Sequence, residues 1–184
     1  MDKSSKSTER KTNIWAPWRM EYISSLSGPR DGCFLCNYQD EPENDRENLV
    51  LWRGQKTFAV INRFPYTGGH CMVAPYEHTS ELGDLGSQTL TEIMESLRDL
   101  QAAISQSLRA EGFNIGINLG RCSGAGLPGH LHAHIVPRWP GDTNFMPVFG
   151  EVRVIPEHLA KTYDRIVTAA KELGLAERYT LAEN

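Results

Sequence analysis

The chain has 184 residues, of which 40% are hydrophobic and 23% are charged, which is ordinary for a globular protein with one buried core. Its formal net charge of −4 excludes a broad basic surface for a nucleic acid polymer or an anionic membrane, so an anionic ligand must be held by a local site. No apolar run is long enough to cross a bilayer or to form a secretory core, and we expect a cytoplasmic protein.

Composition divides the chain into three expected parts. Residues 1–13 are polar and charged and should form a disordered tail, residues 14–176 should form a single domain, and residues 177–184 should form a C-terminal tail. Near the start of the domain, the aromatic segment Trp15–Tyr22 has no clean hydrophobic period. It is predicted to pack on the domain or on a second subunit.

The first half of the domain is predicted to be loop followed by strands. Residues 28–47 are rich in Gly, Pro, Asp, Asn and Glu, which favours loop apart from one turn that carries two cysteines. Apolar runs bounded by turn residues predict strands at 49–52, 57–62 and 69–74. Because short turns connect them, we expect consecutive antiparallel strands.

The second half is predicted to alternate helices and strands. Apolar residues at three- and four-residue steps predict one amphipathic helix over 87–110, and a half-buried strand should follow at 113–120. A Gly-rich loop then leads into another strand, and a last helix is expected at 156–173. This order predicts an α+β domain with a mainly antiparallel sheet of about five strands.

Three of the six histidines alternate in the segment Gly129–Trp139, at His130, His132 and His134. An alternation of period two predicts a strand with the imidazoles on one face and apolar residues on the other. Same-face residues of a strand lie roughly 6.5 to 7 Å apart, so one metal ion is not expected to bind all three rings. A neutral imidazole has a lone pair that can attack phosphorus near neutral pH. The segment therefore predicts nucleophilic chemistry.

Two cysteines, Cys33 and Cys36, are spaced to present two thiolates from one turn. A closed tetrahedral zinc site needs two more ligands, and histidines must supply them because the chain has no second cysteine pair. A redox dithiol and two unrelated buried cysteines stay open as alternatives, although no thioredoxin-like sequence surrounds the pair.

The alternating histidines resemble the signature of the histidine triad (HIT) family of nucleotide hydrolases and transferases. Asn62–His70 resembles the family segment that enters a strand beside the nucleotide, and Asn114–Gly120 resembles the strand before the triad. Two further blocks, Trp15–Tyr22 and Pro137–Phe145, resemble the bacterial branch that includes diadenosine tetraphosphate phosphorylases. A HIT-like fold is therefore expected.

The resemblance also implies roles for individual residues. His132 would attack an α-phosphorus and form a nucleotidyl-histidine intermediate, with its other ring nitrogen donating to an acceptor such as a backbone carbonyl. His134 would contact phosphate oxygens or the leaving group, and the Gly-rich loop offers donors for the charge that develops on phosphorus. The expected nucleotide-binding residues are Asn62, Asn118, Gly120, Ser123, Gly124, His132 and His134. The expected ligands of a structural zinc ion are Cys33, Cys36, His78 and His130.

We expect a homodimer that cleaves dinucleoside polyphosphates, with phosphorolysis favoured over hydrolysis by the two branch-specific blocks. A hydrolase of other adenine nucleotide conjugates and a nucleotide-binding regulatory module with little turnover are the alternatives. A metal hydrolase or oxygenase with His132 and His134 as ligands is disfavoured because no acidic residue at a recognisable spacing completes such a site. Many HIT members have a Gly-Gln-Ser/Thr-Val run before the triad, whereas this chain has Gly126–Gly129, which lacks those side-chain donors.

Overall fold

The computed structural model describes two parts of the chain, residues 32–142 and residues 157–182. The predicted N-terminal tail and the segment Trp15–Tyr22 lie outside these residues, as do residues 143–145 at the end of the second branch-specific block. Within the described parts, no helix combines the length and the apolar character needed to span a membrane.

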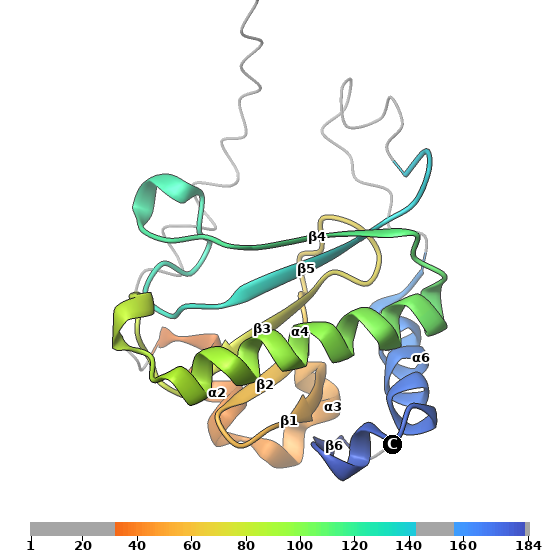
Figure 1. The fold of residues 1–184 in the computed structure, drawn as a ribbon, viewed down its shortest axis with the longest axis horizontal. Coiled ribbons are helices and arrows are strands. Elements are labelled where there is room, and N and C mark those ends of the chain that lie inside the picture. Colours follow the sequence, from red (N-terminus) through yellow and green to blue (C-terminus); the bar gives the residue numbers. More distant parts are fainter. Residues whose placement is uncertain (1–31, 143–156, 183–184) are drawn as a thin grey trace, which may run out of the picture.

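An antiparallel sheet forms the centre of the described structure (Figure 1). Its six strands are β1 (Val50–Arg53), β2 (Thr57–Ile61), β3 (Cys71–Pro75), β4 (Gly112–Ile117), β5 (Ala133–Arg138) and β6 (Thr180–Leu181). Their order is β4-β5-β3-β2-β1-β6, so β5 lies between β4 and β3. The α+β prediction is confirmed, with one strand more than expected.

The additional strand, β6, lies in the segment that was predicted to be a C-terminal tail. It pairs with β1 through Trp52 and Arg53. The preceding Tyr179 stacks on the Trp52 ring at 5.3 Å, and its hydroxyl donates to the buried carboxylate of Asp99 at 2.8 Å. These contacts hold the segment against the sheet, and its short length hid it from a pattern search.

Helices occupy most of the described part of the segment 28–47, so the prediction of loop was wrong there. The structure has α2 (Phe34–Asp40), a short 3-10 turn (Pro42–Asn44) and α3 (Asp45–Asn48). The Arg53 guanidinium joins the two helices, because it donates to the Asp45 carboxylate and to the Tyr38 carbonyl oxygen. Burial of Leu35 and this ion pair outweigh the turn-forming composition.

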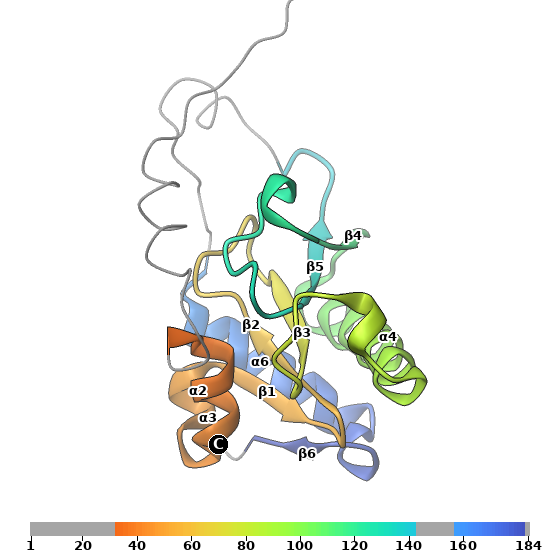
Figure 2. The same ribbon diagram turned by 90° about the vertical axis from the view of Figure 1, so that its left-hand side faces the viewer.

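Two further helices, α4 (Ser87–Leu108) and α6 (Leu159–Glu172), pack on one face of the sheet, and α2 lies on the other face (Figure 2). The long helix predicted to reach residue 110 ends at Leu108 because Arg109 has a φ of 56°. The last helix begins at Leu159 after His158, whose Nδ1 accepts from the Ala160 N–H.

Alternate residues of the central strands enter two separate apolar clusters. On β2, Ala59 and Ile61 face α4 and α6, whereas Phe58 and Val60 pack with residues of α2. The same alternation on β3 places Met72 in the α2 cluster. The sheet is therefore covered on both faces at its centre, which makes it a rigid support for side chains on its outer strands.

Candidate functional site

Of the three alternating histidines, His130 and His132 precede β5 and only His134 lies within the strand. The strand begins at Ala133, so the prediction that His130 and His132 belong to it was wrong. Just before β5, the chain is held outside the sheet ladder. There the Leu131 N–H donates to the Thr79 carbonyl oxygen at 2.6 Å. The alternation of burial is kept, because Leu131, Ala133 and Ile135 all enter the core beneath α4.

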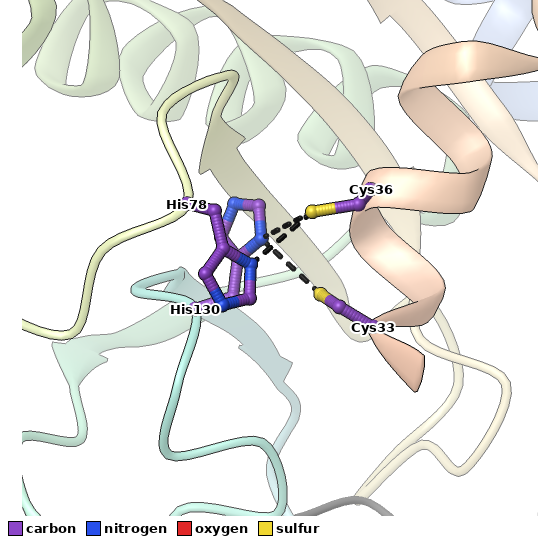
Figure 3. A group of neighbouring side chains, drawn as sticks. All are labelled: Cys33, Cys36, His78 and His130. Atoms are coloured by element: carbon purple, nitrogen blue, oxygen red, sulfur yellow. Dashed lines mark hydrogen bonds between the residues drawn. The ribbon is translucent and has the colours of Figure 1, made fainter. Parts of the chain in front are cut away.

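Four predicted metal ligands converge beside α2 (Figure 3). Cys33 precedes the helix and Cys36 lies in its first turn, while His78 follows β3 and His130 precedes β5. Their ligand atoms all lie within 4.8 Å of one another. The Cys33 Sγ is 3.3 Å from the His130 Nδ1, and the Cys36 Sγ is 3.2 Å from the His78 Nδ1 and 3.5 Å from the His130 Nδ1.

The geometry of this group fits a tetrahedral zinc ion. Zinc bonds of about 2.0 to 2.3 Å at tetrahedral angles place neighbouring ligand atoms roughly 3.3 to 3.8 Å apart, close to the three sulfur–nitrogen distances of 3.2 to 3.5 Å. The His130 Nε2–H donates to the Pro75 carbonyl oxygen at 2.9 Å, so the His130 Nδ1 lone pair points at the thiols. Burial raises the pKa of Cys33 to about 11, and a bound cation would reverse this shift by stabilising the thiolate.

A backbone carbonyl oxygen determines which ring nitrogen of His132 carries the proton. Its Nδ1 lies 2.8 Å from the carbonyl oxygen of His130, so Nδ1–H donates and Nε2 keeps its lone pair. Sequence analysis expected an acceptor of this kind. Only 5% of the residue is exposed, and burial lowers the pKa of His132 although the hydrogen bond to His130 raises it. The ring is therefore neutral near neutral pH.

His134 stands beside His132 on the same side of the chain. The two rings meet edge to face, with centroids 4.8 Å apart. Burial, together with repulsion from His132, lowers the pKa of His134 to about 4, so this ring is neutral as well. Its Nδ1 is 3.0 Å from the His70 Nε2, and its Nε2 is 3.4 Å from the Asn118 Nδ2.

His70 was not among the site residues expected from the sequence. The structure buries it completely between Tyr66, whose ring stacks on it at 4.6 Å, and His134. The register explains the contact, because Met72 pairs directly with His134 and His70 is two residues before Met72. Knowledge that β3 pairs with β5 would have identified it, and no local pattern carries that information.

The predicted nucleotide-binding residues fall into two groups. Asn62 and Asn118 both lie within 3.4 Å of an imidazole nitrogen, that of His70 or His134 respectively. Gly120, Ser123 and Gly124 instead surround a 3-10 turn after β4, in which both glycines have positive φ. The Ser123 hydroxyl donates to the Gly120 carbonyl oxygen at 2.7 Å.

The segment Gly126–Gly129, which lacks the side-chain donors considered in the sequence analysis, contributes packing instead. Leu127 is 4% exposed and belongs to the apolar cluster that includes Cys33, Cys36 and Met72. Leu127 therefore packs the segment before the histidines against the two cysteines at the start of α2. This contact gives a structural reason for an apolar residue at that place.

Comparisons with known proteins agree on one family. A family model described as the HIT domain matches residues 43–141. The AP-4-A phosphorylase of Mycobacterium tuberculosis is 39% identical over 160 residues, which cover 84% of this chain and 82% of that protein. The asymmetrical bis(5'-nucleosyl)-tetraphosphatase of Schizosaccharomyces pombe is 33% identical over 115 residues, covering 62% and 63%. A Zn-bound histidine triad family protein from Mycobacterium smegmatis superimposes with a TM-score of 0.65 at 25% identity, covering 80% of this chain and 99% of that chain.

Proposed function

The chain belongs to the histidine triad (HIT) family, and on that basis we propose that this HIT-family enzyme cleaves dinucleoside polyphosphates with His132 as the nucleophile. The observation that carries the proposal is the pair of buried, neutral imidazoles in which the His132 Nε2 has a lone pair beside His134. The similarity to AP-4-A phosphorylase over most of the chain supports the choice of substrate.

In the proposed first step, the His132 Nε2 attacks the α-phosphorus and forms a phosphorus–nitrogen bond. The bond from phosphorus to the bridging oxygen breaks, and its electron pair leaves with the departing nucleotide. His134 and Asn118 would contact phosphate oxygens, and Asn62 would bind the ribose. The backbone N–H groups of the loop around Ser123 would stabilise the charge that develops on phosphorus.

In the second step, orthophosphate or water attacks the same phosphorus and releases His132. We favour orthophosphate because the AP-4-A phosphorylase resembles this chain over more of its length than the tetraphosphatase does. A hydrolase is the second candidate, since the S. pombe relative is named for hydrolysis of nucleosyl tetraphosphates.

Product analysis with diadenosine tetraphosphate tests this proposal. ADP and ATP that form only with orthophosphate indicate phosphorolysis, whereas AMP and ATP without it indicate hydrolysis. His132→Ala should abolish both, and full turnover by this variant excludes the mechanism. Tight nucleotide binding by the unaltered protein without cleavage indicates a regulatory module instead.

We also propose that Cys33, Cys36, His78 and His130 bind one structural zinc ion. The ligand distances and the Zn-bound neighbour support this assignment. When bound, zinc would hold α2 against the residues that precede β5. It would have a structural role and take no part in the reaction. Metal analysis should find about one zinc per chain, retained in His132→Ala and lost in Cys33→Ser. Loss of zinc in His132→Ala would instead assign the metal to the alternating histidines.

A homodimer is proposed on the basis of β4, an edge strand of the sheet. Ile115 is 50% exposed and the nearby Leu119 is 43% exposed, and an edge strand has unpaired backbone groups that a second copy can cover. Light scattering should therefore give twice the mass of one chain, with Ile115→Lys shifting the mass toward one chain. A monomer at tens of micromolar would contradict this proposal.

A cytoplasmic location is proposed because two thiolate ligands stay reduced there.

A further inference from the structure

We propose that Arg53 positions the two thiols of the zinc site, so that they face the two imidazoles before a metal ion binds. Arg53 is always protonated and cannot be a ligand itself, so it acts through the helix that carries the cysteines and is a positioning residue. The inference rests on the zinc site proposed above and on no step of the proposed reaction.

The four proposed ligands come from two separate parts of the fold (Figure 3). His78 follows β3 and His130 precedes β5. Beside them, the Leu131 N–H donates to the Thr79 carbonyl oxygen at 2.6 Å, which holds these two segments together through the backbone. The two cysteines instead lie at the start of α2, so the position of this helix decides whether all four ligands meet.

The helix α2 is too short to be stable alone. It has seven residues, whereas isolated helices shorter than about 12 residues are marginal in water. Its N-cap residue, Cys33, makes no side-chain capping hydrogen bond, and its last turn has no basic side chain to bind the terminal carbonyl groups. Contacts from other elements must therefore hold α2 in place.

Arg53, at the end of β1, supplies such contacts. Its Nη2–H donates to the Tyr38 carbonyl oxygen, and its Nη1–H donates to the Gln39 carbonyl oxygen at 3.4 Å. Both carbonyl groups lie near the end of α2, two and three residues after Cys36. The same guanidinium donates to the Asp45 carboxylate of α3 from Nε at 3.0 Å and from Nη2. One side chain thus joins α2 to α3 and to the sheet.

The pair of Arg53 and Asp45 is shielded from solvent. Their side chains are 13% and 14% exposed, and a bidentate contact between a guanidinium and a carboxylate fixes direction as well as distance. The adjacent residue of α3, Arg46, forms an ion pair with Asp164 in which both side chains are 48% exposed. Solvent screens that second pair, so it should contribute little to the position of α2.

The Arg53 guanidinium also borders the segment that carries His78. Its Cζ lies 5.9 Å from the centroid of the Phe58 ring, and this ring stacks on Tyr76 at 5.7 Å. Tyr76 is two residues before His78, and its hydroxyl donates to the Gly54 carbonyl oxygen at 3.2 Å, next to Arg53 in the chain. Arg53 is therefore connected both to the helix of the thiols and to the segment of one imidazole.

This arrangement has a consequence for metal affinity. Because Arg53 orders α2 when the protein folds, the thiols do not have to be ordered when zinc binds. Ligands that are already in place bind more tightly, since the entropy cost of ordering falls outside the binding step. Substitution of residues that orient metal ligands typically lowers metal affinity by about 10- to 100-fold.

Competition between the zinc-loaded full chain and a chelator of known zinc affinity measures the effect. Arg53→Gln keeps a polar side chain and removes the bidentate guanidinium, so it should weaken zinc binding at least about tenfold. Arg46→Gln is the matched control, because it removes the same charge from the exposed pair on α3 and should change the affinity less than about twofold. Equal zinc affinities of Arg53→Gln and the unaltered chain overturn the inference.

Cobalt(II) in place of zinc separates positioning from general stabilisation. Tetrahedral cobalt with thiolate ligands absorbs strongly in the visible range, and the bands depend on the angles between the ligands. In folded Arg53→Gln these bands should weaken or shift, because the thiols are no longer held toward the imidazoles. A lower melting temperature with an unchanged cobalt spectrum and unchanged zinc affinity would show that Arg53 only stabilises the fold, which contradicts the inference.

Asp45→Asn tests the same contact from its other partner and decides the question if Arg53→Gln does not fold. It keeps the shape of the side chain and removes the charge that orients the guanidinium, so zinc affinity should fall in this variant as well. An unchanged affinity argues against the inference. An unaltered chain that binds no zinc refutes the zinc site and the inference with it, whereas tight binding that is insensitive to both substitutions refutes the inference alone.

Discussion

The rings of His132 and His134 contact different neighbours in the fold. A backbone carbonyl oxygen orients His132, whereas the His134 Nδ1 lies 3.0 Å from the Nε2 of His70, whose Nδ1 accepts from the Tyr66 N–H. A backbone carbonyl oxygen was expected as the acceptor from the sequence, and the structure identifies it as that of His130. The contact between His134 and His70 depends on the pairing of β3 with β5, which brings together residues 64 positions apart. Local spacing therefore predicts the nucleophile better than it predicts the residues that contact its neighbour.

The lowered pKa of His134 predicts a dependence of stability on pH. Between its folded pKa of about 4 and its ordinary value of about 6.5, the unfolded chain binds more protons than the folded one. Stability should therefore fall as the pH is lowered through this window, by up to about 1 kcal/mol per pH unit from this residue.

Urea unfolding between pH 5 and pH 7.5 measures this slope, with zinc content checked at each pH. His134→Asn keeps a polar side chain and removes the titrating group, so its slope should be shallower than that of the unaltered chain. Equal slopes would show that His134 does not gain protons on unfolding.

A glycine on the entry to β3 gives a second prediction at this scale. Gly69→Ala should lower the free energy of unfolding by about 1 to 3 kcal/mol, because the left-handed backbone and the contact with Leu108 both oppose a Cβ. Gly83→Ala is the matched control, since a Cβ at Gly83 meets nothing within 4 Å. Denaturant unfolding of both variants tests it, and equal losses would argue against a special requirement at residue 69.

Among the secondary structure elements, those with strong hydrophobic periodicity were predicted most closely. The helix predicted at 87–110 is α4, and the strands around Phe58 and Met72 were placed within about two residues, the usual uncertainty of element ends. The helices at 34–48 were missed because their polar composition favours turns when tertiary contacts are ignored. Arg53, which lies beyond them in sequence, supplies such a contact.

The attachment of β6 depends on one buried carboxylate on α4. Tyr179→Phe removes the hydroxyl that donates to Asp99 and should lower the free energy of unfolding by about 1.5 to 3 kcal/mol, since the acceptor is charged. Arg98→Gln is a suitable comparison, because the Arg98 side chain is 56% exposed and solvent screens its ion pair with Asp99, so its loss should cost less than that of the Tyr179 hydroxyl. Chemical denaturation compares the two, and a larger loss from Arg98→Gln would contradict this account.

At the scale of the whole molecule, the proposed zinc site and the proposed nucleophile share one residue. His130 directs its ring toward the thiols and its carbonyl oxygen toward the His132 ring. The resemblance implied the four metal ligands and the nucleophile, with zinc on His130 expected to orient the strand that carries the histidines. The structure adds the contact that joins them, the His130 carbonyl oxygen on the His132 ring.

If the proposed zinc ion is bound, its removal should therefore affect both stability and turnover. Treatment with a zinc chelator is expected to lower the melting temperature by several degrees and to reduce turnover at least about tenfold, because His130 loses the bond to zinc that fixes its position. Calorimetry and product assays before and after added zinc check the result, and recovery with zinc separates metal loss from irreversible unfolding. Full activity of the metal-free protein would show that the His130 carbonyl needs no metal to orient His132.

The strand order leaves one strand edge unpaired while the protein is being synthesised. β5 lies between β3 and β4 although both precede it in the chain, so a ribosome has made both neighbours before the strand that joins them exists. Until then β3 has an open edge, and open edges pair readily with strands of other molecules. A nascent chain that stalls before Ala133 should consequently aggregate or recruit chaperones, whereas one released after Arg138 can close the sheet.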